Sequence, residues 1–108
     1  MALSVGDKNN RCYLISYVSD QDTSGFEPDT QQEIRKKAWC KVESISGREF
    51  ARMGQNNIRP SCRVTIWENE YSDQDTVELD GKKYGVYRTY QPNPEEVELY
   101  LERKAGDI

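Results

Sequence analysis

Apolar and polar residues alternate along several short runs of this chain, and this pattern predicts a fold made mainly of strands. Each run has the length of a single strand or of a hairpin. The runs are 11–18, 38–45, 61–67, 77–90 and 97–102. The first run is apolar on both sides, with Leu14 on one face and Ile15 on the other. We therefore expect one of its faces inside the fold and the other against a neighbour.

A tight turn is predicted inside the run 77–90. Asp80-Gly81 lies between two segments of strand-forming residues, and this dipeptide readily adopts the positive φ that a two-residue hairpin turn requires. Gln91–Pro94 is expected to end the second of these strands. All four prolines are expected outside the strands, since proline cannot donate a hydrogen bond to a sheet. The predicted fold is mostly β, a small six-stranded antiparallel barrel.

One long polar segment, Ser19–Lys37, interrupts this pattern. Loops of such length in compact domains are often functional, and an ordinary surface loop is the alternative. Within the segment, Thr30 and Glu33 have capping-box spacing, which favours a short helical turn at 30–36.

A second interruption predicts a short helix. Ser46 and Glu49 repeat the capping-box spacing, and Gly54 is placed to end the helix. A helix of about two turns is too short to be stable alone. We therefore expect Phe50 and Met53, which lie on one helical face, to pack on the sheet.

Composition indicates one small domain, 11–104, between a loose N-terminus, 1–10, and a C-terminal tail, 105–108. The chain has 108 residues, of which 35% are hydrophobic, and seven are tyrosines. Few aliphatic residues and many tyrosines suit a thin barrel that completes its burial in an assembly. A small, well-solvated monomer is the alternative. The net charge of −4 argues against tight wrapping of DNA, although an acidic domain can surround DNA without gripping it.

The cysteines indicate a reducing compartment. Cys12, Cys40 and Cys62 are odd in number and lie in predicted strands, and the N-terminus does not resemble a signal peptide. We expect reduced, mostly buried thiols in a cytoplasmic protein. No run approaches the roughly 20 apolar residues of a membrane helix, so no membrane contact is expected.

The residue types argue against catalysis. The chain has no histidine, which removes the usual triads, the commonest general base and most zinc sites. The glycines form no phosphate-binding loop. Asp73, Asp75 and Glu78 lie in a polar region where solvated charge is the default. We expect no enzymatic activity, no cofactor and no metal.

Aromatic residues offer two interpretations. Tyr84, Tyr87 and Tyr90, with Arg88, either form a stacking platform for single-stranded nucleic acid or pack across the strands. The acidic balance favours packing. Trp39 and Trp67 fall on outward faces, which suits an interface; placement in the core is the alternative.

The order of these segments resembles the small head–tail adaptor proteins of tailed bacteriophages, also called head-closure or head-completion proteins. The likeness rests on Ala38–Phe50, Val64–Trp67 and Asp80–Tyr87, in this order, and spans about 11–104. Trp67 is a departure, because the family often has an arginine after the strand of this type.

The resemblance implies a small barrel that forms a ring, twelvefold like the portal, at the head–tail interface of the virion. Assembly would take place in the host bacterial cytoplasm. A portal or adaptor protein would lie above the ring and a tail completion or tail tube protein below it. Genomic DNA would pass through without sequence-specific binding.

The resemblance also implies roles for particular residues. The loop 19–37 would project into the channel and block DNA exit, and its acidic side chains would repel phosphate. The residues expected in this role are Asp20, Asp22, Phe26, Glu27 and Asp29. The residues expected at a subunit or partner interface are Trp39, Arg48, Glu49, Phe50, Trp67 and Tyr87. The alternative function is a small β-barrel module that binds single-stranded nucleic acid or a peptide.

Overall fold

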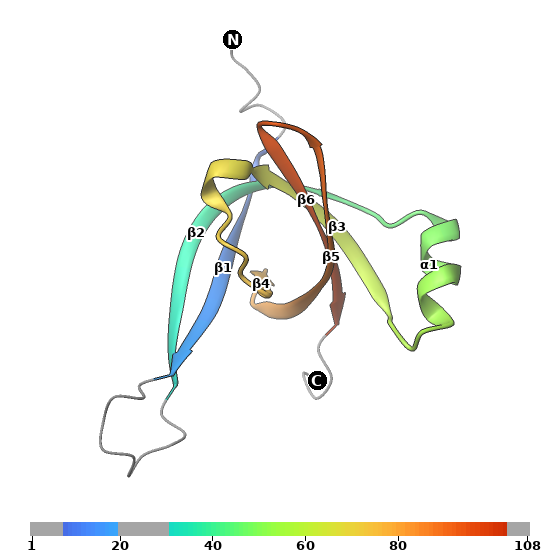
Figure 1. Cartoon of the computed structure of the whole chain (residues 1–108), viewed down its shortest axis with the longest axis horizontal. Coiled ribbons are helices and arrows are strands. Elements are labelled where there is room, and N and C mark those ends of the chain that lie inside the picture. Colours follow the sequence, from blue (N-terminus) through green and yellow to red (C-terminus); the bar gives the residue numbers. More distant parts are fainter. Residues whose placement is uncertain (1–7, 20–30, 104–108) are drawn as a thin grey trace.

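The computed structural model describes residues 8–19 and 31–103, which form a closed antiparallel barrel with the strand order β1-β2-β3-β6-β5-β4 (Figure 1). The strands are β1 (Asn10–Ser19), β2 (Gln31–Glu43), β3 (Pro60–Trp67), β4 (Thr76–Leu79), β5 (Lys82–Asn93) and β6 (Glu96–Arg103). Helix α1 (Gly47–Gly54) connects β2 to β3, and the 3₁₀ turn η2 (Glu68–Glu70) follows β3. The predicted six-stranded barrel with one short helix is confirmed.

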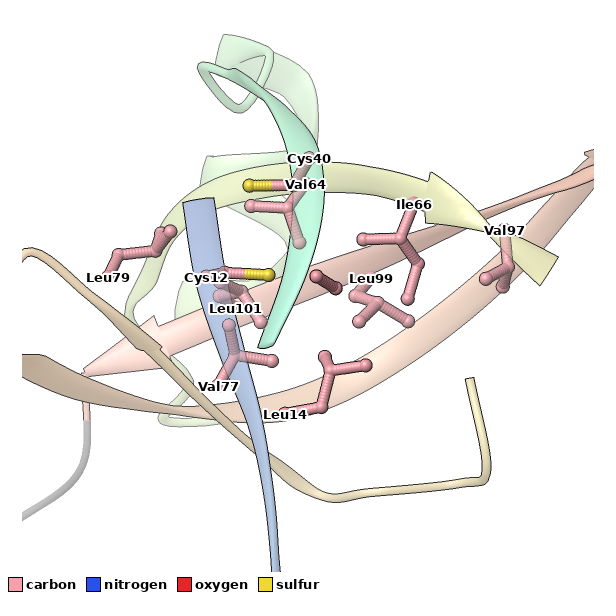
Figure 2. Close-up of a cluster of buried hydrophobic side chains, with 11 residues drawn as sticks. Cys12, Leu14, Cys40, Val64, Ile66, Val77, Leu79, Val97, Leu99 and Leu101 are labelled. Carbon is pink, nitrogen blue, oxygen red and sulfur yellow. The ribbon is translucent and has the colours of Figure 1, made fainter. Parts of the chain in front are cut away.

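The interior of the barrel is filled by small and medium apolar side chains (Figure 2). The buried cluster is Cys12, Leu14, Ala38, Cys40, Val64, Ile66, Val77, Leu79, Val97, Leu99 and Leu101. Five of the six strands contribute to it, and β5 adds the partly buried Tyr84 and Val86. Burial of each leucine or isoleucine removes apolar surface worth roughly 1.5–3 kcal/mol from water, so this cluster is the main source of stability.

The three cysteines are free thiols, as the sequence predicts. Cys12 and Cys40 are fully buried in the core, and Cys62 is partly buried at its margin. Burial and the neighbouring Cys40 raise the pKa of the Cys62 thiol to about 11, so this group is neutral at physiological pH.

The β4–β5 hairpin turns at Asp80-Gly81, as predicted. The φ angles are +51° at Asp80 and +80° at Gly81, the two positive values that a type I′ turn needs. Val77 and Leu79 on one side of the turn point into the core. The turn therefore fixes which face of β4 is buried.

The expectation of a loop at 19–37 is wrong for its second half. Gln31–Lys37 is the first part of β2 and pairs with Tyr13–Ser19 of β1, so no helical turn forms at 31–36. β2 pairs with β3 only over Lys41–Glu43, and the β1–β2 hairpin projects beyond the barrel as an arm (Figure 1). The arm lies outside the barrel, so neither of its faces has to be apolar. For this reason the polar sequence of Gln31–Lys37 does not differ from that of a loop. Residues 20–30 lie outside the described residues.

Two further expectations need correction. Pro60 is the first residue of β3, and Pro92 lies inside β5, which runs on to Asn93. Both lie where the pairing register with β6 shifts, and a strand tolerates proline at its first residue or at such an irregularity. Residues 8–10 are not loose, because Lys8 is buried and Asn10 begins β1.

Candidate assembly surface

Helix α1 is attached to the barrel by a carboxylate rather than by the apolar pair that the sequence predicts. Its N-terminus is capped as expected, with Ser46 Oγ accepting a hydrogen bond from the Glu49 backbone N–H at 3.2 Å. Phe50, however, is 54% exposed, and Met53 is only partly buried. Glu49 is the buried residue of the helix, at 8% exposure.

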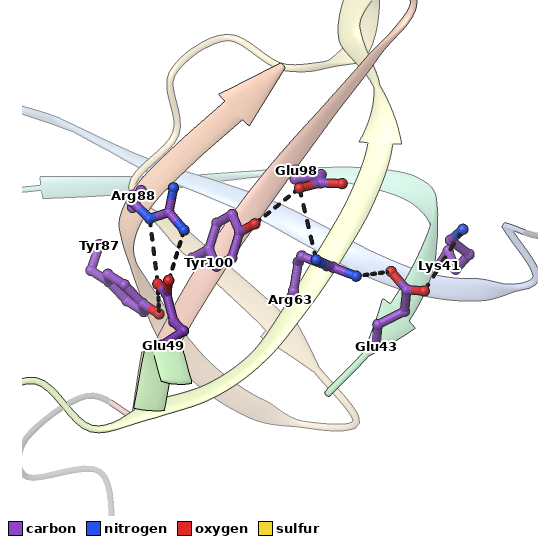
Figure 3. A network of polar contacts seen from close by, with 8 residues as sticks. All are labelled: Lys41, Glu43, Glu49, Arg63, Tyr87, Arg88, Glu98 and Tyr100. Atoms are coloured by element: carbon purple, nitrogen blue, oxygen red, sulfur yellow. Dashed lines mark hydrogen bonds and ion pairs between the residues drawn. The ribbon is translucent and has the colours of Figure 1, made fainter. Parts of the chain in front are cut away.

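The carboxylate of Glu49 is held by two residues of β5 (Figure 3). Tyr87 Oη donates a hydrogen bond to Oε2 at 2.9 Å, and Arg88 Nη2 donates to Oε1 at 2.9 Å. Neighbouring residues in a strand normally point to opposite faces, but the pairing register between β5 and β6 shifts between Val86 and Arg88. This irregularity lets Tyr87 and Arg88 reach the same group.

The pKa values of these side chains follow from their contacts. Burial favours the neutral acid, but the hydrogen bonds from Arg88 and Tyr87 outweigh it and lower the pKa of Glu49. Burial and the negative charge of Glu49 raise the pKa of Tyr87, and the bond to Glu49 raises the pKa of Arg88. At neutral pH the contact is therefore an ionised carboxylate held by a phenol and a guanidinium.

A belt of polar and aromatic contacts continues from this point across the outside of the barrel (Figure 3). The guanidinium of Arg88 lies 4.0 Å from the ring centre of Tyr100, whose hydroxyl donates to Glu98 at 3.0 Å. Arg63 on β3 lies 4.0 Å from Glu98 and forms an ion pair of 2.6 Å with Glu43 on β2. The belt thus links α1 to β5, β6, β3 and β2. Each exposed pair adds little alone, and the contacts of this belt that touch the helix directly are those of Glu49 with Tyr87 and Arg88 on β5.

The β1–β2 arm carries a second set of contacts. Arg35 lies 4.7 Å from the ring centre of Tyr13 and forms an ion pair of 2.9 Å with Glu78 on β4. Beyond these contacts the arm exposes apolar side chains. Tyr17 is 40% exposed, Val18 46% and Ile34 48%. One face of β1 was expected to lie against a neighbour, but Leu14 and Ile15, which are on opposite faces, are both fully buried within the chain.

The structure separates the expected interface residues into three places. Arg48, Glu49, Phe50 and Tyr87 lie together at α1, where Glu49 and Tyr87 contact each other within the chain. An intersubunit ion pair from Glu49 is therefore not expected, since Arg88 already neutralises it.

The two tryptophans lie elsewhere. Trp39 on β2 is 46% exposed and lies beneath the guanidinium of Arg11, 4.8 Å from its ring centre. Trp67, at the end of β3, is partly buried, and Lys8 Nζ lies 3.7 Å above its ring and pairs with Glu96. Contact of either tryptophan with a partner stays a prediction.

The residues expected to gate a channel, at 20–29, lie outside the described residues. The role of Arg88 in holding Glu49 was not predicted, nor were the parts of Arg63 and Tyr100 in the belt. No sequence pattern marks the register shift that brings Tyr87 and Arg88 to one side. The buried lysine, Lys8, was missed because the polar N-terminus looked loose.

The tyrosines of β5 do not form a shared stacking surface. Tyr84 packs against the core, and Tyr87 makes an edge-to-face contact with Tyr100 at 6.2 Å between ring centres. Tyr90 is 54% exposed. Tyr84 and Tyr87 therefore pack within the chain.

The described residues, 8–19 and 31–103, contain no group of metal ligands and no membrane-spanning helix. In this part of the chain, no three histidine, cysteine or acidic side chains are grouped to hold a metal ion. Within the same residues, no helix is long and apolar enough to cross a membrane.

The filled barrel and the belt that fastens α1 to it define a small structural β-barrel with a projecting helix and a projecting arm. Comparison with protein families identifies it further. Residues 3–106 match the family model of phage head completion proteins, and the chain belongs to this family. A search of curated proteins found no match. The chain is accordingly a structural component of the phage head, and the resemblance predicted from the sequence is confirmed.

Proposed function

We propose that this protein forms a ring beneath the portal of the phage head and joins the capsid to the tail. Membership of the head completion family places it in the virion head, and the distribution of its exposed apolar side chains supports a ring. Among the described residues, seven large hydrophobic side chains are exposed, and five of them, namely Tyr17, Val18, Ile34, Trp39 and Val42, lie on the β1–β2 hairpin. Apolar side chains gathered on one hairpin suit a surface that other proteins cover. This uneven distribution is the observation that carries the proposal.

The neighbours in this proposal are the portal or an adaptor protein above and a tail completion or tail tube protein below. The ring has twelve subunits, matching the portal, and assembles in the host cytoplasm. Genomic DNA passes along its axis without sequence-specific contacts. The net charge of −4 supports passage without tight binding.

Addition of the purified protein to tailless heads tests the ring. Cryo-electron microscopy of heads with and without added protein is expected to show one additional ring below the portal. The same protein should not bind capsids assembled without portal. Absence of the ring on portal-containing heads at micromolar protein would contradict the proposal.

We further propose that the segment between β1 and β2 gates the exit of DNA, and this role needs a separate test. Ser19 of β1 and Gln31 of β2, the residues on either side of 20–30, pair at the tip of the projecting arm (Figure 1). Deletion of Phe26–Thr30 should leave ring formation intact and increase the loss of DNA from tailless heads, measured by nuclease sensitivity. Unchanged DNA retention with a normal ring would show that the loop is not a stopper, without affecting the connector role.

A further inference from the structure

Opposite charges gather at the two ends of β3. Four exposed arginines and the exposed Phe50 lie on α1, on the residues just before β3, and at the end of β6 beside it. We name these residues the arginine face: Arg48, Arg52, Arg59 and Arg103, with Phe50. Among the described residues, none of the four arginines forms an ion pair within 4.0 Å. A surface hollow of about 660 Å³ opens between Phe50, Arg59 and Arg103.

After β3, the segment 68–75 carries only acidic charges. We name its three exposed carboxylates the acidic face: Glu68, Asp73 and Asp75. Asp73 and Asp75, together with Ser16, Tyr17 and Gln74, line a hollow of about 460 Å³. Tyr17 gives this hollow an apolar wall that is 40% exposed.

The two faces cannot contact each other within one chain. β3 has eight residues, so its ends are about 23 Å apart at roughly 3.3 Å per residue. In Figure 1, α1 lies at one end of the long axis of the molecule, and η2 lies on the other side of the barrel. One chain thus presents two distant surfaces of opposite charge, each with an exposed aromatic ring.

From this arrangement we infer that the arginine face of one subunit docks on the acidic face of the next, with Phe50 entering the hollow beside Tyr17. The occupant of each face is therefore a second copy of this chain. Contact between two different surfaces of identical subunits is heterologous, and such contacts generate a ring when the rotation closes. A twofold contact would instead bring like charges together. The inference rests on the proposed ring and specifies which surfaces form it.

Charge reversal of each face separately tests the inference. The first variant carries Arg59→Glu and Arg103→Glu, and the second carries Asp73→Asn and Asp75→Lys. Asparagine is chosen at position 73 because φ is +62° there, a value that asparagine tolerates. The number of subunits bound per portal-containing head is measured, and circular dichroism reports the fold.

Each variant alone is expected to bind heads at least tenfold less than the wild type, because the reversed side chains then meet side chains of the same charge across the contact. An equimolar mixture should restore binding to within twofold. In a mixed ring of alternating subunits, the reversed side chains again meet side chains of opposite charge, so this rescue cannot come from misfolded protein. A control with Lys82→Glu changes the net charge in the same direction as the first variant does. Lys82 is exposed and lies outside the two faces and outside the β1–β2 hairpin, so this control should bind normally.

The possible failures are distinguishable. Normal rings from either variant alone, or no rescue by the mixture of two folded variants, would overturn the assignment of the faces and leave the connector role standing. Absence of a ring with wild-type protein would overturn both the proposed function and this inference.

Discussion

Glu49→Ala should release helix α1 from a barrel that stays folded. The buried carboxylate accepts hydrogen bonds of 2.9 Å from Tyr87 and from Arg88, and its charge lies in the first turn of the helix. A hydrogen bond to a charged group contributes about 1.5 kcal/mol at the low end of its range. The ion pair with Arg88, whose side chain is 40% exposed, is reduced by solvent to about 0.5 kcal/mol. The favourable contact with the helix dipole adds about 0.3 kcal/mol.

The sum is about 2 kcal/mol for the docking of α1, after a small offset for the high helix propensity of alanine. An isolated helix of eight residues is not stable in water, so a helix that loses its attachment also loses its internal hydrogen bonds. Hydrogen exchange of the α1 amides should therefore become about 30-fold faster, since 1.4 kcal/mol corresponds to a factor of ten. Amides of the core strands β3 and β6 should change by much less.

Native-state hydrogen exchange followed by mass spectrometry or NMR measures this directly. Glu95→Ala is the matched control, because Glu95 is an exposed turn glutamate whose side chain forms no hydrogen bond or ion pair with the described residues. A double-mutant cycle between Glu49→Ala and Tyr87→Phe should give a coupling energy of about 1 kcal/mol. Exchange of α1 amides within threefold of the wild type, or strict additivity in the cycle, would refute this account of how the helix is held.

Three other outcomes can be measured by equilibrium unfolding. Gly81→Ala should destabilise the fold by about 1 kcal/mol because φ is +80° at this position. Gly54 lies at the end of a helix, and a methyl group added there meets nothing within 4 Å. Gly54→Ala should therefore be neutral or stabilise the fold by up to about 0.5 kcal/mol. Equal effects of the two in urea would contradict the turn geometry. Leu99→Ala, at a fully buried site, should cost about 3 kcal/mol, and a loss below about 1 kcal/mol would show that the core collapses around the cavity. Acid should destabilise the fold through Glu49 and Glu96, because their pKa values are lowered on folding and the unfolded chain then binds more protons. Their contribution is complete above the ordinary value of 4.5 and is lost as pH falls through the lower folded values, so a flat stability curve between about pH 5 and pH 3 would contradict it.

The features that were predicted correctly from the sequence are those set by neighbouring residues. The turn at Asp80-Gly81 and the N-cap at Ser46 need only two to four residues, and both are where the pattern indicates. The alternation predicted for 61–67 and 97–102 is also correct, since Val64 and Ile66 of β3 and Val97, Leu99 and Leu101 of β6 lie in the core.

The errors concern segments whose structure depends on distant partners. Gln31–Lys37 has no core to face and is a strand because β1 lies beside it. Glu49 was expected to complete a capping box, but its side chain is taken by two residues almost 40 positions later in the sequence. Nothing near Glu49 in the sequence distinguishes a capping box from contacts with a distant strand. The strand at Gln31–Lys37 depends on pairing with β1, and the contacts of Glu49 depend on the register shift in β5.

The filled interior of the barrel has a consequence for the path of the genome. Eleven buried side chains occupy the space between the strands, and no passage remains inside a subunit of this size (Figure 2). A double helix that crosses the proposed ring must therefore run between subunits, along an opening bounded by their outer surfaces. Variants that alter the speed of genome ejection without altering stability should accordingly map to outward-facing residues, and core variants should act only through the number of folded subunits.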